Sequence, residues 1–67
     1  MVTEAMRGRD LRAERVRALL KQAELADELG MARSALHYIE TEQVPVDAPF
    51  IERYMAAIAA LVERRGE

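Results

Sequence analysis

Residues 22–39 read QAELADELGMARSALHYI, and this stretch decides the fold. Ala26 is small enough to let a second helix cross closely, and four positions later Gly30 can adopt the positive φ angle that ends a helix. Large apolar residues recur at helical spacing on both sides of this glycine: Leu25, Leu29, Leu36 and Ile39. Because residues one turn apart share a helix face, the spacing predicts two short helices packed across a tight turn.

The same residues carry a resemblance to the helix-turn-helix of the lambda-repressor-like family (Cro-type, XRE). Five of them stand at positions typical of that family: Gln22, Ala26, Gly30, Leu36 and Ile39. The resemblance extends back to Leu11 and Arg12 and forward through Glu40, which is roughly half of the chain. It implies a compact all-α domain that binds an operator in duplex DNA, usually as a homodimer.

The segment before the motif predicts a first helix. Asp10 is the expected N-cap, and Thr3 offers an alternative, earlier start. The apolar positions form an incomplete stripe that we expect to face the core: Leu11, Val16, Leu19 and Leu20. The arginines between them would then lie on the solvent side of this helix.

Three further helices are predicted downstream, which makes four in an all-α domain. The helix-turn-helix occupies residues 22–41, with helices over 22–29 and 33–41. The prolines of QVPVDAP then break the helical pattern, since each disfavours helix at the preceding residue. Asp47 can cap a long final helix over residues 48–65. A fifth helix, usual in the family, is either absent or merged into this last one.

Length and composition narrow the class of protein. A chain of 67 residues is expected to form one domain, residues 1–67, whose thin core favours oligomerisation. The absence of cysteine and the single His37 leave no ligand set for a metal and suit a reducing cytoplasm. No catalytic constellation or glycine-rich phosphate loop is present, so we expect neither an enzyme nor a cofactor. No apolar run is long enough for a signal peptide or a membrane span.

The charge balance is unusual for a DNA-binding protein, because the net charge is −2 and phosphate binding normally depends on basic residues. Basic residues gather in the first half of the chain: Arg7, Arg9, Arg12, Arg15, Arg17, Lys21 and Arg33. The second half is weighted towards acid: Glu42, Asp47, Glu52, Glu63 and Glu67. One basic face would reconcile this balance with DNA binding. The alternative is a helix-turn-helix fold that binds a protein, as an antirepressor, antitoxin or polymerase-binding factor.

The final helix carries the uncharged run YMAAIAALV from Tyr54 to Val62. Apolar atoms therefore surround this helix for more than two turns, and a helix that is apolar on all sides is usually buried on more than one of them. The surplus apolar residues are expected to form a homodimer interface: Met55, Ala56, Ala59, Ala60 and Val62. The alternative is that alanines are present only because they favour helix.

The second helix of such a motif enters the DNA major groove and presents its outward side chains to base edges. By resemblance to the family, the candidate base-reading residues here are Arg33, Ser34 and Tyr38, and His37 lies on the same exposed face. Arg33 is the strongest candidate, because a guanidinium can donate two parallel hydrogen bonds to guanine. The alternatives are a solvated Arg33, a partly packed Tyr38 and an unpartnered surface His37.

Other residues are expected to contact the DNA backbone. Gln22 begins the first helix of the motif, where backbone N–H groups favour a phosphate, and in the family a glutamine here bridges DNA and the recognition helix. Gln43 in the following loop, with Arg7 and Arg9 near the N-terminus, can add phosphate contacts. An acidic Glu42 beside this path would be repelled by phosphate.

The resemblance also implies an internal ion pair between Arg15 and Glu40, which would tie the first helix to the recognition helix. Several residues depart from the family pattern. Ala32 stands where serine or threonine commonly caps the recognition helix, and Glu14 stands where the first helix is usually apolar. Thr41, Glu42 and Gln43 replace the Asn-Gly turn that often follows the position of Glu40.

Overall fold

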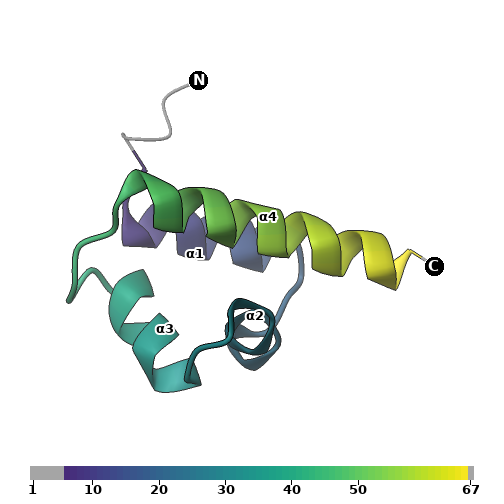
Figure 1. Cartoon of the computed structure of the whole chain (residues 1–67), viewed down its shortest axis with the longest axis horizontal. Helices are drawn as coiled ribbons and strands as arrows, with labels where there is room; N and C mark the ends of the chain where they lie inside the picture. The colour runs from purple at the N-terminus through teal and green to yellow at the C-terminus, as the bar shows by residue number, and fades with distance from the viewer. Residues whose placement is uncertain (1–5, 67) are drawn as a thin grey trace.

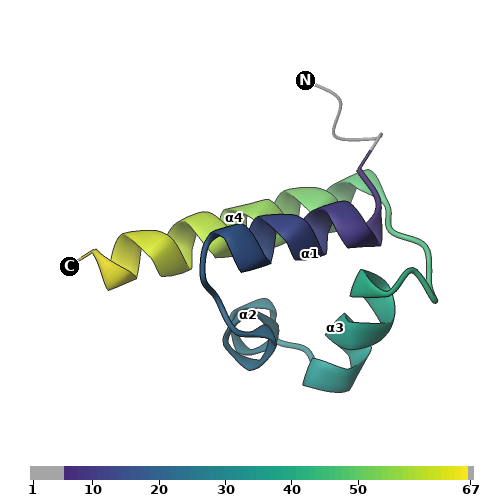
Figure 2. The same cartoon turned by 180° about the vertical axis from the view of Figure 1, so that it is seen from behind.

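The computed structural model describes residues 6–66, which fold into four helices and no strand. They are α1 (Gly8–Arg17), α2 (Gln22–Leu29), α3 (Arg33–Glu40) and α4 (Ala48–Arg65). In Figures 1 and 2, α1 and α4 lie side by side and run in the same direction, with α4 extending past the end of α1. The pair α2 and α3 packs beneath them. The predicted all-α class with a long last helix is confirmed.

The start of α1 differs from the prediction. The helix begins at Gly8, so Asp10 is its third residue and not its N-cap. The Asp10 carboxylate instead accepts a hydrogen bond from the backbone N–H of Arg7 at 2.8 Å. Gly8 allows the early start because a Cβ atom here would lie 1.9 Å from the carbonyl oxygen of Ile39. The alternative start at Thr3 lies outside the described residues.

The remaining helix ends follow local chemistry. Gly30 has a φ of 72° and ends α2, as predicted. Asp47 caps α4 by accepting a hydrogen bond from the N–H of Phe50 at 3.0 Å, also as predicted. Helix α3 stops one residue earlier than predicted, because Thr41 is its C-cap and Glu42 turns into the left-handed region at φ 63°.

The core lies where α1, α2 and α3 meet α4. Its buried apolar residues are Leu11, Leu20, Leu25, Ala26, Leu29, Leu36, Ile51, Tyr54, Ala57 and Ile58. The expectation that Val16 and Leu19 would also face the core was wrong, since they are 49% and 80% exposed. Val16 lies within α1, five residues after buried Leu11 and about 140° around the helix from it. Leu19 follows the end of α1 at Arg17 and adopts a left-handed φ of 61° that carries its side chain outwards.

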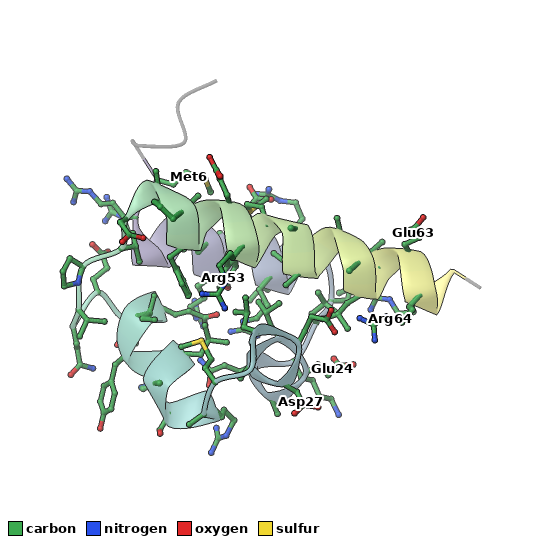
Figure 3. The ribbon with its side chains drawn as sticks, in the orientation of Figure 1. Met6, Glu24, Asp27, Arg53, Glu63 and Arg64 are labelled. Atoms are coloured by element: carbon green, nitrogen blue, oxygen red, sulfur yellow. The ribbon has the colours of Figure 1, made fainter. Side chains whose placement is uncertain are left out.

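Two arginines fasten the far end of α4 to the other helices. Arg65 donates to the carbonyl oxygens of Ala18 and Leu19 at the end of α1. Carbonyl groups at a helix end lack partners within the helix, so a guanidinium there satisfies them. Arg64 pairs with Glu28 of α2 and, in Figure 3, extends from α4 towards that helix.

Candidate nucleic-acid interface

The outer face of α3 presents the side chains that the sequence marks as base-reading candidates. Arg33, Ser34, His37 and Tyr38 are all exposed. The rings of His37 and Tyr38 pack edge to face, with centroids 6.1 Å apart. Tyr38 is 49% exposed and does not belong to the buried core. These four residues therefore form a continuous polar and aromatic surface on one short helix, which we call the α3 face.

The first turn of α3 differs from that of the other three helices. In each of those helices an acidic side chain accepts a backbone N–H near the start: Asp10 in α1, Glu24 in α2 and Asp47 in α4. Ala32 at the N-cap of α3 offers no such acceptor, and the first turn has no acidic residue. The positive end of this helix dipole thus lies beside Arg33 without a negative side chain to offset it.

Four helices converge on the carboxylate of Glu40 at the end of α3. Arg15 of α1 donates from Nε to Oε2 and from Nη2 to Oε1, both at 2.9 Å. Gln22 of α2 donates from Nε2 to Oε1 at 3.0 Å, and the hydroxyl of Tyr54 in α4 donates to Oε2 at 2.6 Å. The Glu40 side chain has no exposed surface, and that of Arg15 is 10% exposed. Each carboxylate oxygen therefore accepts two hydrogen bonds in a buried site, which we call the Glu40 cluster.

The charges in the Glu40 cluster are stabilised by each other. Burial disfavours the charged form of Glu40, but hydrogen bonds from Arg15, Tyr54 and Gln22 outweigh it and lower the pKa of Glu40 below its usual 4.5. The hydrogen bond to Glu40 raises the pKa of Arg15 despite its burial. Burial, reinforced by Glu40, raises the pKa of Tyr54 well above 10.0, so its hydroxyl stays a donor. The cluster is thus an ion pair completed by two neutral donors.

The family resemblance paired Arg15 with Glu40 and gave Gln22 a role in DNA contact, but Tyr54 was assigned no role beyond apolar packing. A signal was available, because a tyrosine hydroxyl that is buried with its ring needs a hydrogen-bond partner. The partner itself could not be found from sequence, since Glu40 and Tyr54 belong to helices separated by the loop that contains Pro45. Arg15 makes one further bond, from Nη1 to the carbonyl oxygen of Leu20 at 2.9 Å.

The loop after α3 carries Glu42 and Gln43, and it places Glu42 near the start of α1. Gln43 is exposed and donates from Nε2 to Oγ1 of Thr41 at 2.9 Å, while Thr41 donates to the carbonyl oxygen of His37 at 2.8 Å. Glu42 faces Arg9, with 3.7 Å between Oε2 and Nε. Glu42 therefore has a cationic neighbour that partly offsets its charge. Arg7 lines the same shallow hollow as Glu42.

The five residues expected at a dimer interface fall into two stripes of α4. Met55, Ala59 and Val62 follow one another at helical spacing; Ala59 is exposed, Val62 is 41% exposed and Met55 packs partly on the core. Ala56 and Ala60 instead line a hollow between α2 and α4. Arg53 borders this hollow and donates to the carbonyl oxygen of Leu29 at 3.1 Å (Figure 3). Because an α-helix turns by about 100° per residue, the acidic Glu52 and Glu63 lie between these two stripes on the surface of α4.

Residues 6–66 hold neither a metal-binding cluster nor a membrane-spanning helix. No group of three or more histidine, cysteine, aspartate or glutamate side chains within this range could hold a metal ion. None of the helices described is long and apolar enough to cross a membrane.

Comparison with known families shows to which family the chain belongs. The profile of the helix-turn-helix domain family matches residues 8–67, which is nearly the whole chain. The chain belongs to this family. Helix-turn-helix domains of this lambda-repressor-like (XRE) group bind DNA and are typically non-enzymatic, so DNA is indicated as the partner. No curated protein and no solved structure was found to match the chain.

Proposed function

We propose that residues 1–67 form a single-domain, repressor-like transcriptional regulator that binds a two-fold-symmetric operator as a homodimer. The α3 face carries this proposal: four exposed side chains capable of contacting bases lie on a helix that is fixed from behind by the Glu40 cluster. A rigidly held helix is what base reading needs, because discrimination depends on hydrogen-bond geometry.

Within this proposal α3 lies in the major groove and Arg33 reads a guanine through its O6 and N7 atoms. Ser34, His37 and Tyr38 contact neighbouring base edges or the thymine methyl group. The uncapped first turn of α3 supports this placement, since an acidic cap there would repel the DNA that Arg33 is meant to approach.

Contacts to the backbone would fix the register of the domain on DNA. Gln22 stands at the first residue of α2, where N–H groups and the helix dipole favour a phosphate. Gln43, Arg7 and Arg9 extend this series from the loop and from the start of α1. The pairing of Arg9 with Glu42 keeps the acidic residue from acting as an unopposed negative charge on that path.

The homodimer is proposed to form through the exposed surface of α4. Met55, Ala59 and Val62 make one apolar stripe, and Ala56 with Ala60 makes a second. Small side chains allow two helices to approach closely, and a domain this short gains stability from association. In the dimer the two copies of α3 would lie about 34 Å apart, one turn of B-DNA.

The test compares wild type with Arg33→Ala on a duplex selected from a random library and on unselected duplex. We expect the variant to fold normally, as Arg33 is exposed, and to lose about 1–3 kcal/mol of discrimination at one base pair of each half-site. Arg12→Ala, on an exposed site of α1, is the matched charge control. Equal weakening on both duplexes would show that Arg33 contacts only phosphate and would contradict its proposed role.

A second candidate is binding to a protein through the acidic surface of α2. Glu24 and Asp27 are exposed and lie on the side of α2 away from α4 (Figure 3), in a chain whose net charge is −2. A basic partner protein would be attracted to such a surface. Glu24→Gln with Asp27→Asn should abolish that interaction while leaving DNA binding intact or stronger.

A further inference from the structure

The contact between Tyr54 and Glu40 is the point where α4 reaches the helix-turn-helix. The Tyr54 side chain is fully buried, and its hydroxyl shares the Oε2 atom of Glu40 with Arg15 Nε. The opposite oxygen, Oε1, is shared by Arg15 Nη2 and Gln22 Nε2. The two oxygens belong to one rigid planar group, so a displacement of Oε2 also displaces Oε1.

Gln22 is the only member of the Glu40 cluster with substantial exposed surface, since it is half buried while the other three are buried. An ionised carboxylate only accepts hydrogen bonds, so the Gln22 amide must present its NH2 group to Glu40. Nε2 carries two hydrogens, and Glu40 uses one of them. The carboxylate therefore fixes which atoms the amide offers to a ligand at the first turn of α2.

We propose that Tyr54 is a positioning residue for DNA binding, which holds the Glu40 carboxylate so that the Gln22 amide is set to donate to a DNA phosphate. This inference rests on the DNA-binding function proposed above and extends it to α4. Without the Tyr54 hydroxyl, Oε2 keeps Arg15 Nε as its single donor, and the carboxylate, still paired with Arg15, is restrained less firmly. The acceptor of the Gln22 amide is then fixed less firmly, and the Gln22 side chain samples other rotamers more often.

A purely structural role predicts a different outcome. Removing the hydroxyl of a buried tyrosine lowers stability whether or not the residue affects DNA binding. A structural role would therefore change the unfolding midpoint and leave the affinity of the folded molecules for DNA unchanged. The distinction needs a variant that lacks the hydroxyl and a control that is destabilised elsewhere.

The test uses Tyr54→Phe, which retains the ring, and Ile58→Val as the control, because Ile58 is buried in α4 and its apolar side chain donates no hydrogen bond to the Glu40 cluster. Affinity for a selected duplex is measured at a temperature where circular dichroism shows each protein fully folded. We expect Tyr54→Phe to bind about tenfold more weakly, which is the effect of losing one hydrogen bond from the Gln22 amide to a charged DNA phosphate. Ile58→Val should bind like wild type. If Tyr54→Phe is not folded in buffer alone, all variants are compared in a stabilising osmolyte such as trimethylamine N-oxide.

Two further measurements assign the effect to Gln22. Gln22→Ala should weaken binding, and adding Tyr54→Phe to it should weaken binding no further. In free wild-type protein the Gln22 side-chain amide should give dispersed NMR signals that move to the positions of an unstructured glutamine in Tyr54→Phe.

The outcomes separate the inference from the proposed function. Wild-type affinity in folded Tyr54→Phe, additive losses in the double variant, or unchanged Gln22 signals would overturn the inference while DNA binding by the wild type stood. A wild-type chain that binds no duplex at low salt would overturn the proposed function and the inference together.

Discussion

Oε2 of Glu40 accepts a hydrogen bond from the Tyr54 hydroxyl at 2.6 Å, which ties α4 to the end of α3. Together with Arg15 and Gln22, this contact makes one carboxylate the meeting point of all four helices. A helix of eight residues has little stability alone. The orientation of α3 therefore depends on this buried cluster as well as on apolar packing.

The Arg15–Glu40 pair should be coupled strongly in stability. Arg15→Met leaves a buried carboxylate without its cation, whereas Arg15→Met with Glu40→Leu removes both charges. We expect the single variant to be less stable than the double by about 1–3 kcal/mol. A double-mutant cycle in urea measures the coupling. Simple additivity would show that the two side chains behave as independent surface charges.

Acid should weaken the fold through Glu40. Its pKa is lower in the folded state than its usual 4.5, so the ionised form stabilises the fold at higher pH. That contribution is complete above the unfolded pKa and is lost as the pH falls below about 4.5 and through the folded pKa. Glu40→Gln should be less stable than wild type near neutral pH, and the difference should shrink on acidification. Urea midpoints measured across this range check it, and a constant difference would argue against the role of Glu40.

The left-handed residue after α3 offers a stabilising substitution. Glu42 has a φ of 63°, which costs an L-residue roughly 1 kcal/mol or more relative to glycine. Glu42→Gly should therefore be more stable than Glu42→Ala by about 1 kcal/mol. Both variants lose the exposed pair with Arg9, so the comparison cancels that contribution. Equal thermal stability would mean that this backbone conformation is not strained.

The α4 surface should support a homodimer. Ala59 is exposed in the isolated chain, so Ala59→Glu leaves the monomer fold intact but places a charge in the proposed interface. We expect sedimentation to give a dimer for wild type and a helical monomer for the variant. Ala13→Glu, at an exposed position of α1, is the control and should remain dimeric. A dimeric Ala59→Glu would exclude this surface as the interface.

The sequence predicted those features that local chemistry determines. Gly30 and Asp47 act within one turn of their own helix, so their roles could be deduced without the fold. The start of α1 could not, because Asp10 is equally suited to the N-cap or the third position. What decides between them is the distant backbone of Ile39 packing on Gly8.

Tertiary contacts explain what the sequence pattern missed at the site. The exposed residues of α3 follow from helical periodicity and the family resemblance. Tyr54 is separated from Glu40 by a loop whose path no local signal specifies, and the same holds for the contact between Arg65 and the end of α1. Leu19 was misassigned because periodicity does not show where a helix ends, and Val16 because an incomplete apolar stripe does not define which face of α1 is buried.

The salt dependence of wild-type binding to random duplex DNA tests the central claim most directly. A surface that neutralises phosphates releases counterions, so the logarithm of affinity should fall linearly and steeply as the logarithm of salt concentration rises. We predict measurable binding at low salt despite the net charge of −2, with a slope that becomes shallower in Arg7→Ala, which removes a proposed phosphate contact. Absence of binding at low salt would contradict the account and favour a protein as the partner of this fold.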